Sequence, residues 1–240
     1  MRTPRFYQPT PLTVNQEVEL SESVFHHACK VLRMEAGDAI TLFNGEGGEY
    51  TGTLCYADKK RARAVFTQFA EKNLTSGRHI HLAQVFNKGD KMEFVVEKAV
   101  ELGVSEITPL FSERCDVRLN GERLEKKMVQ LKNAIISACE QCGMNILPKL
   151  NQAKDFSDWI KQKPCATNLI LDPEATNRLS DFTSHQDSIS LVIGPEGGFS
   201  AGELQAALDA GLTGIQLGQR ILRTETAALA AISALQFGVN

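Results

Sequence analysis

The pattern of hydrophobic and polar positions changes character near residue 72. Before it, short runs rich in β-branched and aromatic residues, such as "DAITLF" (38–43) and "ARAVFTQF" (62–69), are separated by turn signals. Only "VFHHACKVLRM" (24–34) has the spacing of a helix. This pattern predicts a small β-rich barrel domain over residues 1–72.

After the polar linker "EKNLTSGR", the pattern becomes strand, helix, strand. "HIHLAQVF" (79–86) and "EITPLF" (106–111) are apolar runs of strand length, and "KMEFVVEKAVELG" (91–103) between them has a helical period. A helix of this length between two strands indicates a parallel pair with a right-handed crossover. Residues 73–240 are therefore predicted to form a second domain of the α/β class.

The same alternation continues to the end of the chain. The stretch "ERLEKKMVQLKNAIISACEQCG" (122–143) is a long amphipathic helix with its apolar residues along one stripe. Three later runs, at 166–172, 188–193 and 214–218, are apolar with little alternation. Strands that are apolar on both faces belong inside a parallel sheet covered on both sides.

Composition excludes some classes of protein. The chain has no run of 18 apolar residues, and its start, "MRTPRFYQPTPL", has no apolar core segment, so we expect neither a membrane span nor a signal peptide. Six scattered cysteines indicate reduced thiols in a cytoplasmic protein. Cys139 and Cys142 lack a second pair, so no metal site is predicted. The net charge of −3 indicates no partner.

The stretch "LVIGPEGGFSAGEL" (191–204) joins a strand to a helix. Ser200 and Glu203 have the spacing of a capping box, and Gly197 and Gly198 leave backbone groups open to a ligand. A loop at the carboxyl end of a strand is where open α/β sheets bind ligands.

What this loop lacks restricts the ligand. It has neither the P-loop nor the dinucleotide spacing of glycines, and it has no lysine or arginine. Glu196 places a negative charge where a phosphate would lie, and Pro195 removes an amide donor. A ligand with an apolar body and a positive centre, such as the sulfonium of S-adenosylmethionine, fits better. A purely structural turn is the alternative.

A second loop occurs in "LGQRILRTETAALAAISALQ". Apolar Ile221 and Leu222 lie between Arg220 and Arg223 in a turn that leads into a helix, for which Thr224 is the expected N-cap. Apolar side chains in a surface turn are expected to be covered by another molecule, and a flat purine could cover them. An ordinary buried carboxyl-terminal helix is the alternative.

Several of these motifs together carry a resemblance. "LILDPEA", "IGPEGGFS" and "LGQRILRTETAALAA", preceded by "KMEFVVEKAVELGVSEITPLFSERC", resemble the RsmE family of ribosomal RNA methyltransferases. That family methylates N3 of a uridine in small-subunit ribosomal RNA. "RFY" and "HHACKVLRMEAGD" resemble its small PUA-like RNA-binding domain, so the resemblance covers nearly the whole chain.

The resemblance implies a SPOUT-type fold, in which a parallel sheet carries a carboxyl-terminal trefoil knot and the enzyme is a homodimer. It also implies S-adenosylmethionine as the methyl donor. Lys88, Lys91 and Lys98 receive no chemistry, because their segments match the family only approximately. The implied donor contacts are Leu171, Gly194, Pro195, Glu196, Gly197, Gly198, Leu217, Gly218, Ile221, Leu222 and Arg223.

The implied reaction needs a proton acceptor and a cation. Uridine N3 carries a proton, so attack on a methyl group requires its removal and stabilisation of the developing anion. We expect Glu196 or Glu225 to accept the proton, and Arg220 or Arg223 to stabilise the anion or hold a phosphate. Glu225 in a first helical turn also has a purely structural explanation, through the helix dipole.

Basic residues in the first domain are candidate RNA contacts. The run "DKKRAR" (58–63) is strongly basic, and two arginines near the amino terminus lie beside "FY". A solvated hairpin explains the run equally well. The candidate RNA-binding residues are Arg2, Arg5, Lys59, Lys60, Arg61 and Arg63.

Two other functions stay open at this point. A non-catalytic RNA-binding protein could retain the knotted fold, and it would bind no S-adenosylmethionine. A nucleotide-dependent α/β enzyme would bind ATP or NAD, but the missing basic phosphate loop argues against it.

Overall fold

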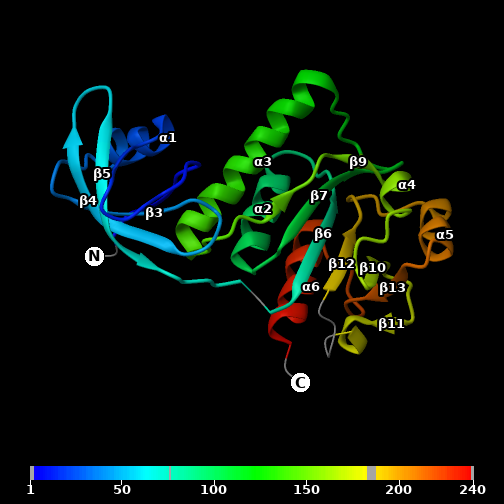
Figure 1. Cartoon of the computed structure of the whole chain (residues 1–240). Coiled ribbons are helices and arrows are strands. Elements are labelled where there is room, and N and C mark those ends of the chain that lie inside the picture. The colour runs from blue at the N-terminus through cyan, green and yellow to red at the C-terminus, as the bar shows by residue number, and fades with distance from the viewer. Residues whose placement is uncertain (1–2, 76, 183–187, 239–240) are drawn as a thin grey trace. The chain divides into compact units, whose positions relative to one another are not determined.

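The computed structural model describes residues 3–75, 77–182 and 188–238 (Figure 1). The chain divides into two compact units, Met1–Thr75 with Cys139–Leu147, and Ser76–Ala138 with Pro148–Asn240. The sequence pattern placed all of residues 139–147 in the second domain. They group with the first unit because their backbone carbonyls bind a side chain of its first strand.

The first unit is built on one five-stranded sheet in the order β1-β3-β4-β5-β2. Its central strands are antiparallel, whereas β1 runs parallel to β3. Phe6, Ile40, Leu42 and Phe66 fill its core and are fully buried, which supports the prediction of a β-rich domain. The strands are β1 (Arg5–Tyr7), β2 (Glu17–Glu19), β3 (Ala39–Phe43), β4 (Glu49–Ala57) and β5 (Ala62–Ala70).

The helix expected at 24–34 differs from a regular α-helix. A single turn, α1 (Glu22–Phe25), begins at Ser21, whose hydroxyl accepts a hydrogen bond from the Val24 amide. The chain then widens into a π-helix, His26–Val31. Over so few residues the apolar spacing of the two helix types is nearly the same, so the sequence could not distinguish them.

Arg5 was expected to contact RNA, but its side chain is buried in the first unit. It forms an ion pair with Glu49 at 3.2 Å, its guanidinium donates to the Cys139 carbonyl at 2.7 Å, and it also bonds Asn145. It stacks over the Phe43 ring as well. Its side chain is only 6% exposed, so it holds residues 139–145 against the sheet and offers nothing to a phosphate.

The second unit contains a parallel sheet in the order β11-β13-β10-β12-β6-β7-β8, with β9 also paired to β7. Every pairing between these strands is parallel, as the strand, helix, strand pattern predicts. The strands are β6 (His79–Val85), β7 (Glu106–Phe111), β8 (Lys149–Leu150), β9 (Lys154–Asp155), β10 (Thr167–Leu171), β11 (Asn177–Arg178), β12 (Ser188–Ile193) and β13 (Thr213–Gln216).

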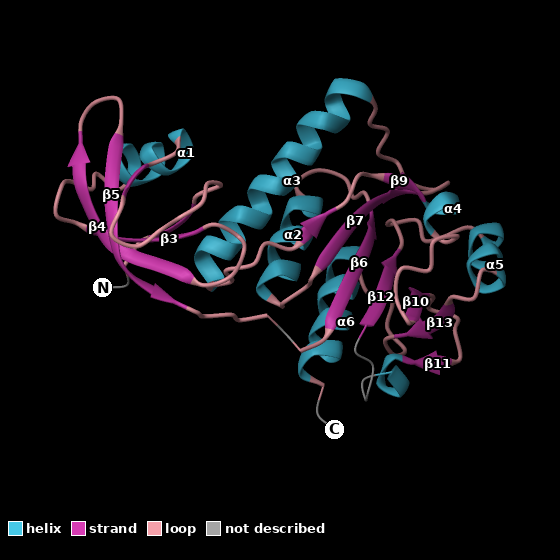
Figure 2. Cartoon of the chain, viewed as in Figure 1, coloured by secondary structure: helices cyan, strands magenta, loops and turns pink. Residues whose placement is uncertain are grey.

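Helices cover this sheet, as the apolar strands require. The helices α2 and α6 pack side by side, and α6 also contacts β6 and β12, whereas α4 contacts β7 and α5 contacts β13 (Figure 2). In the described residues, no helix is long and apolar enough to cross a membrane. The helices are α2 (Lys91–Glu101), α3 (Gly121–Cys142), α4 (Phe156–Trp159), α5 (Ala201–Asp209) and α6 (Thr224–Phe237), with a 3-10 helix at Leu179–Phe182.

The strand order defines where a ligand would bind. From β6 the chain goes to β7 on one side, whereas β12 and β10 lie on the other, so the topology switches between β6 and β12. In open α/β sheets, ligands bind outside the carboxyl ends of the strands at such a switch point. The segments that follow β6, β12 and β13 all begin at this edge.

Candidate active site

The loop that follows β12, residues 194–200, is here called the GPEGG loop. Gly198 has a φ of +67°, and its amide closes the turn on the Pro195 carbonyl at 3.0 Å. A Cβ on Gly194 would lie 3.0 Å from the Phe199 ring. Glycine is therefore required at both positions, by backbone angle at one and by close packing at the other.

The predicted capping box at the start of α5 is confirmed. The Ser200 hydroxyl accepts from the Glu203 amide at 3.1 Å, and the Glu203 carboxylate accepts from the Ser200 amide at 2.9 Å. The second carboxylate oxygen of Glu203 accepts from the Glu113 amide, beyond β7, at 2.9 Å. The capping box thus also fixes the GPEGG loop to the neighbouring segment.

Arg114 is a residue of this site that the sequence analysis missed. It follows β7, and its guanidinium donates to the carbonyls of Gly197 and Phe199, both at 3.3 Å. The only local signal was the run "SERC", which gives no indication of a partner 83 residues away. Arg114 braces the GPEGG loop from one side.

The loop that follows β13, residues 217–223, is here called the arginine loop. Gly218 has a φ of +119°, which other residues rarely adopt. Ile221 is 86% exposed, Arg220 and Arg223 are also exposed, and Leu222 is half-buried. The side chain of Ile221 is therefore open to another molecule, and the predicted cover by a ligand stays a prediction.

The expectation that Thr224 caps α6 is wrong. Arg223 occupies the N-cap position without a side-chain cap bond, and Thr224 is the first residue of the helix. The Thr224 hydroxyl donates instead to the Gly194 carbonyl at 2.7 Å and accepts from Gln84 at 3.1 Å. The carbonyl left free where β12 ends is the better partner, and this bond joins the arginine loop to the GPEGG loop.

The residues that the sequence predicts to contact the methyl donor therefore lie at one edge of the sheet. Leu171 ends β10 and pairs in register with Ile215 of β13, and β10 itself lies between β13 and β12. Leu171, Gly194 and Leu217 thus stand at or just beyond the carboxyl ends of three neighbouring strands.

The two candidate proton acceptors share one cation. The Lys91 ammonium lies 3.7 Å from a Glu196 oxygen and 3.5 Å from a Glu225 oxygen. Glu196 also accepts from the backbone amide of Lys88 at 3.4 Å. The other oxygen of Glu225 is buried and has no hydrogen-bond partner within the described part of the chain.

Further buried polar atoms occur near the ends of β6 and β7. Gln84, Asn87 and Ser112 are at most 7% exposed, yet an atom of each side chain has no hydrogen-bond partner among residues 3–75, 77–182 and 188–238. Buried polar atoms are nearly always paired in folded proteins. Unpaired donors and acceptors at a ligand-binding edge fit a polar ligand.

A second polar cluster lies toward the amino ends of the same strands. His81 bonds the Thr108 hydroxyl at 2.7 Å, and Asn151 donates to both Thr108 and Glu106. The Trp159 ring packs edge-on against His81. Burial lowers the pKa of His81 to about 4 and keeps the imidazole neutral at pH 7.

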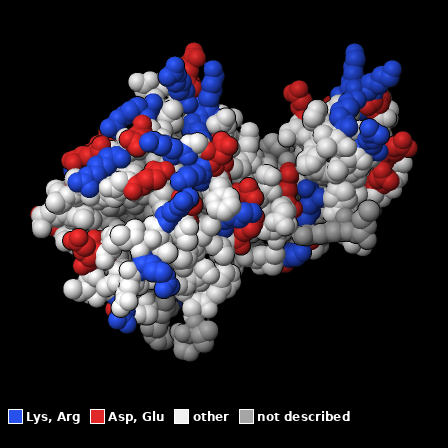
Figure 3. All heavy atoms as spheres, turned by 180° about the vertical axis from the view of Figure 1, so that it is seen from behind, with Lys and Arg blue, Asp and Glu red and all other residues white. Residues whose placement is uncertain are grey.

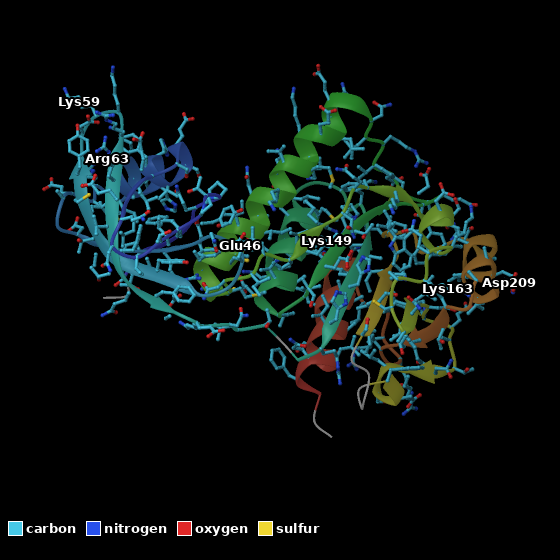
Figure 4. All side chains as sticks on the ribbon, viewed as in Figure 1. Glu46, Lys59, Arg63, Lys149, Lys163 and Asp209 are labelled. Atoms are coloured by element: carbon cyan, nitrogen blue, oxygen red, sulfur yellow. The ribbon has the colours of Figure 1, made fainter. Side chains whose placement is uncertain are left out.

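The basic run of the first unit forms the turn between β4 and β5, where Figure 4 shows Lys59 and Arg63. Asp58 organises this turn by accepting from Tyr56 and from two backbone amides, and the Tyr56 hydrogen bond is the largest cause that lowers the pKa of Asp58 to about 2. Arg63 forms ion pairs with Glu17 and Glu19. Arg2 lies outside the described residues.

A cavity of about 980 Å³ opens beside this turn. Its walls include the exposed side of the π-helix and the basic turn, and Lys30 bridges the two by donating to the Lys59 carbonyl at 2.9 Å. The residues that supply basic or ring nitrogen atoms to the cavity are His26, His27, Lys30, Lys59, Lys60 and Arg61.

Neither surface charge nor candidate metal ligands indicate a further site in the described residues. Basic and acidic side chains are interspersed over the face shown in Figure 3, as a net charge of −3 implies. In the described ranges, no three histidine, cysteine, aspartate or glutamate side chains are grouped so that they could hold a metal ion. The cysteines, including Cys139 and Cys142, form no disulfide in the described residues.

A family model described as an RNA methyltransferase domain matches residues 75–236, and one described as an RNA methyltransferase PUA domain matches residues 20–67. With the parallel sheet described above, these matches place the chain among the RNA methyltransferases of the α/β class. Relatives named ribosomal RNA small subunit methyltransferase E are similar over nearly the whole chain. The chain belongs to the family of ribosomal RNA small subunit methyltransferase E, which confirms the resemblance.

The similarity extends over full-length proteins. The relative from Buchnera aphidicola of Schizaphis graminum is 38% identical over 98% of this chain and 96% of its own, and that from Rickettsia conorii is 32% identical over 97% and 95%.

Two solved structures are also similar to this chain over nearly its whole length. A Legionella pneumophila protein in complex with its bound cofactor S-adenosylmethionine has 42% identity and a TM-score of 0.96, covering 99% of this chain and 98% of its own. The methyltransferase E of Neisseria gonorrhoeae bound to S-adenosylmethionine has 40% identity and a TM-score of 0.93, covering 98% and 97%.

Proposed function

We propose that this protein transfers the methyl group of S-adenosylmethionine to N3 of a uridine in small-subunit ribosomal RNA. Membership of the methyltransferase E family and the donor bound by its two structural relatives support an S-adenosylmethionine-dependent ribosomal RNA methyltransferase. The observation that carries the proposal is the Thr224 bond to the Gly194 carbonyl, since it joins the two loops proposed to hold the donor. The non-catalytic alternative is not favoured.

The chemistry of the two loops fits this donor. The GPEGG loop has no cationic side chain and carries Glu196, which suits a positive sulfonium and not a polyphosphate. Ile221 and Leu222 offer an apolar surface to the adenine, and the unpaired atoms of Gln84, Asn87 and Ser112 offer hydrogen bonds. When bound, the donor supplies a methyl group activated by the sulfonium.

We propose that the Glu225 carboxylate takes the proton from N3 of the uridine that is methylated. Its free oxygen is buried and unpaired among the described residues, whereas Glu196 is a third exposed and is already bonded to the Lys88 amide. A buried carboxylate with a free lone pair is the better placed proton acceptor. Arg220 and Arg223, exposed on the arginine loop, stabilise the developing anion or hold the adjoining phosphate.

For RNA contact outside the reacting base, we propose the basic cavity of the first unit. Lysines and an arginine on its walls would meet phosphates, and the histidines of the π-helix offer rings for stacking. Arg63 contributes less, because two carboxylates already pair with it. Arg2 remains a proposed contact from sequence alone.

Neutralising Lys59, Lys60 and Arg61 together to glutamine tests this contact. RNA affinity should fall, and the slope of log affinity against log salt should decrease in magnitude by about 2. Fluorescence titrations at several salt concentrations measure the slope. An unchanged slope would remove the cavity from the proposal.

Oligomeric state, topology and location are also proposals. We propose a homodimer with a carboxyl-terminal trefoil knot, acting in the cytoplasm where ribosomal subunits assemble. The exposure of Ile221 and the tie between the GPEGG loop and the start of α6 support a compact carboxyl-terminal assembly. Light scattering coupled to gel filtration tests the dimer, since a monomeric mass would exclude it.

The decisive test of the activity uses labelled donor and small ribosomal subunits that lack the modification. Label should enter one uridine of the ribosomal RNA, and mapping of that base should show methylation at N3. Label on another base, or on the ribose, would overturn the assignment. Free RNA and assembled subunits as parallel substrates identify which is accepted.

A further inference from the structure

Lys91, the first residue of α2, connects two segments of the site. Its ammonium is within 4 Å of Glu196 on the GPEGG loop and of Glu225 in the first turn of α6. These residues are far apart in the chain, and α2 and α6 lie side by side (Figure 2). The sequence analysis gave Lys91 no role.

One cation between two carboxylates has a clear electrostatic consequence. Two carboxylates so close to one point repel each other unless a positive charge lies between them. The distances of 3.7 and 3.5 Å are those of ion pairs rather than of short hydrogen bonds. Lys91 therefore stabilises both charges while leaving a Glu225 oxygen free.

Other charged groups near this point are already engaged elsewhere. The ammonium of Lys88 binds Asp116 at 2.7 Å, and Arg114 binds backbone carbonyls of the GPEGG loop. Cys115 is buried, which raises the pKa of its thiol and keeps it neutral. On α2 itself, Glu93 pairs with Lys127 at 2.8 Å.

The exposed charges of the arginine loop, Arg220 and Arg223, complete the set of charged groups around the site. Within the described residues, Lys91 is the cation whose ion pairs reach both Glu196 and Glu225.

We propose that Lys91 is a positioning residue for methyl transfer, which holds Glu196 and Glu225 together through its two ion pairs and turns Glu225 toward the acceptor base. The part of this inference that concerns catalysis rests on the proposed function. Lys91 acts through the two carboxylates and does not itself touch the reacting atoms.

Lys98 provides a matched control on the same helix. It also bridges two carboxylates, those of Glu97 at 2.8 Å and Glu101 at 2.7 Å, and its exposure of 34% is close to the 38% of Lys91. Replacing either lysine by methionine removes one cation and two ion pairs from α2. Only Lys91 has partners in the proposed site.

The first experiment measures kcat and the KM for RNA at saturating donor. For Lys91→Met, kcat should fall about tenfold while KM stays nearly unchanged, because Glu225 loses the ion pair that positions it. Lys91→Arg should restore kcat, and Lys98→Met should match the unmodified protein.

An equal loss of kcat in Lys98→Met would overturn the proposal, since it would indicate a general effect on α2 and not a role of the two ion pairs of Lys91. Kinetic constants for Lys91→Met that match the unmodified protein would do the same.

The second experiment needs no methyl transfer. Hydrogen exchange of the amides in residues 194–200 and 223–227 should be several-fold faster in Lys91→Met than in Lys98→Met or Lys91→Arg, because the two segments lose their shared ion pair. If the unmodified protein does not methylate ribosomal RNA, the proposed function is contradicted. Hydrogen exchange still tests the positioning role of Lys91 in that case. Equal exchange in all variants would overturn its positioning role.

Discussion

The two edges of the parallel sheet both hold polar clusters, yet they differ in how those clusters are built. At the amino edge, Asn151, Thr108 and Glu106 bond one another within the sheet, and His81 is neutral beneath Trp159. At the carboxyl edge, Gln84 of β6, Asn87, Ser112 and Glu225 of α6 each have a buried atom without a partner in the described residues, and two loops turn on glycines at positive φ.

This difference shows what distinguishes a site from a structural network. Histidines, carboxylates and amides occur at both edges, so residue type alone does not decide. Both edges also have buried polar atoms without a partner in the described residues, and the ring Nδ1 of His81 is one at the amino edge. The carboxyl edge adds two loops that turn on glycines at positive φ and expose Ile221, so backbone groups and an apolar side chain are open there to a ligand.

The largest expected effect is on kcat, and it differs between the two edges of the sheet. Glu225→Gln should lower kcat by about 10² or more, since the proton acceptor is lost, with little change in unfolding. The matched change at the amino edge, Glu106→Gln, should leave kcat near normal and lower stability. Single-turnover methylation and urea unfolding measure the two quantities. A fully active Glu225→Gln would break the comparison.

The next effect concerns pH and the amino edge. The unfolded chain protonates His81 near pH 6.5, whereas the folded protein does so near pH 4. Above pH 6.5 neither state holds the proton, and as pH falls to 4 the unfolded state gains it first. The free energy of unfolding should therefore decrease by roughly 3 kcal/mol over this window.

Urea unfolding at pH 7.5 and pH 4.5 measures this loss, with His81→Leu as the variant that should flatten the dependence. If the variant keeps the full pH dependence, the neutral histidine of the amino edge is not its source.

A smaller effect concerns the GPEGG loop. Gly198→Ala places a side chain at φ +67° and should cost about 1 to 2 kcal/mol, seen as roughly tenfold weaker donor binding in calorimetry. Gly202→Ala, inside α5 with nothing closer than the Ser200 hydroxyl at 3.8 Å, should be neutral or stabilising. Equal affinity in both variants would show that the backbone angle is unimportant.

Much of the fold could be predicted from the sequence because its signals are local. Apolar runs identified β6, β7, β10, β12 and β13, and helical spacing identified α2 and α3. Ser200 and Glu203 indicated the capping box, because both partners lie within one helical turn. Gly197 and Gly198 indicated the first loop, and apolar Ile221 and Leu222 between two arginines indicated the second.

Several predictions failed where a residue's partner lies far along the chain. Arg5 looked like an RNA contact but binds carbonyls more than 130 residues away, and Thr224 looked like a cap but bonds Gly194. Nothing local to Arg114 or Lys91 indicated their distant partners. A single sequence records which groups are available, not which of them meet.

By itself the sequence therefore determined the two-part organisation, the parallel strands and the loops at their carboxyl ends, because hydrophobic period and capping act within a few residues. Only the tertiary structure decided which groups face each other: Lys91 between Glu196 and Glu225, Arg5 against the last turn of α3, and His81 neutral beside Trp159. Electrostatic and hydrogen-bond energies depend on distance in space, and folding alone sets that distance.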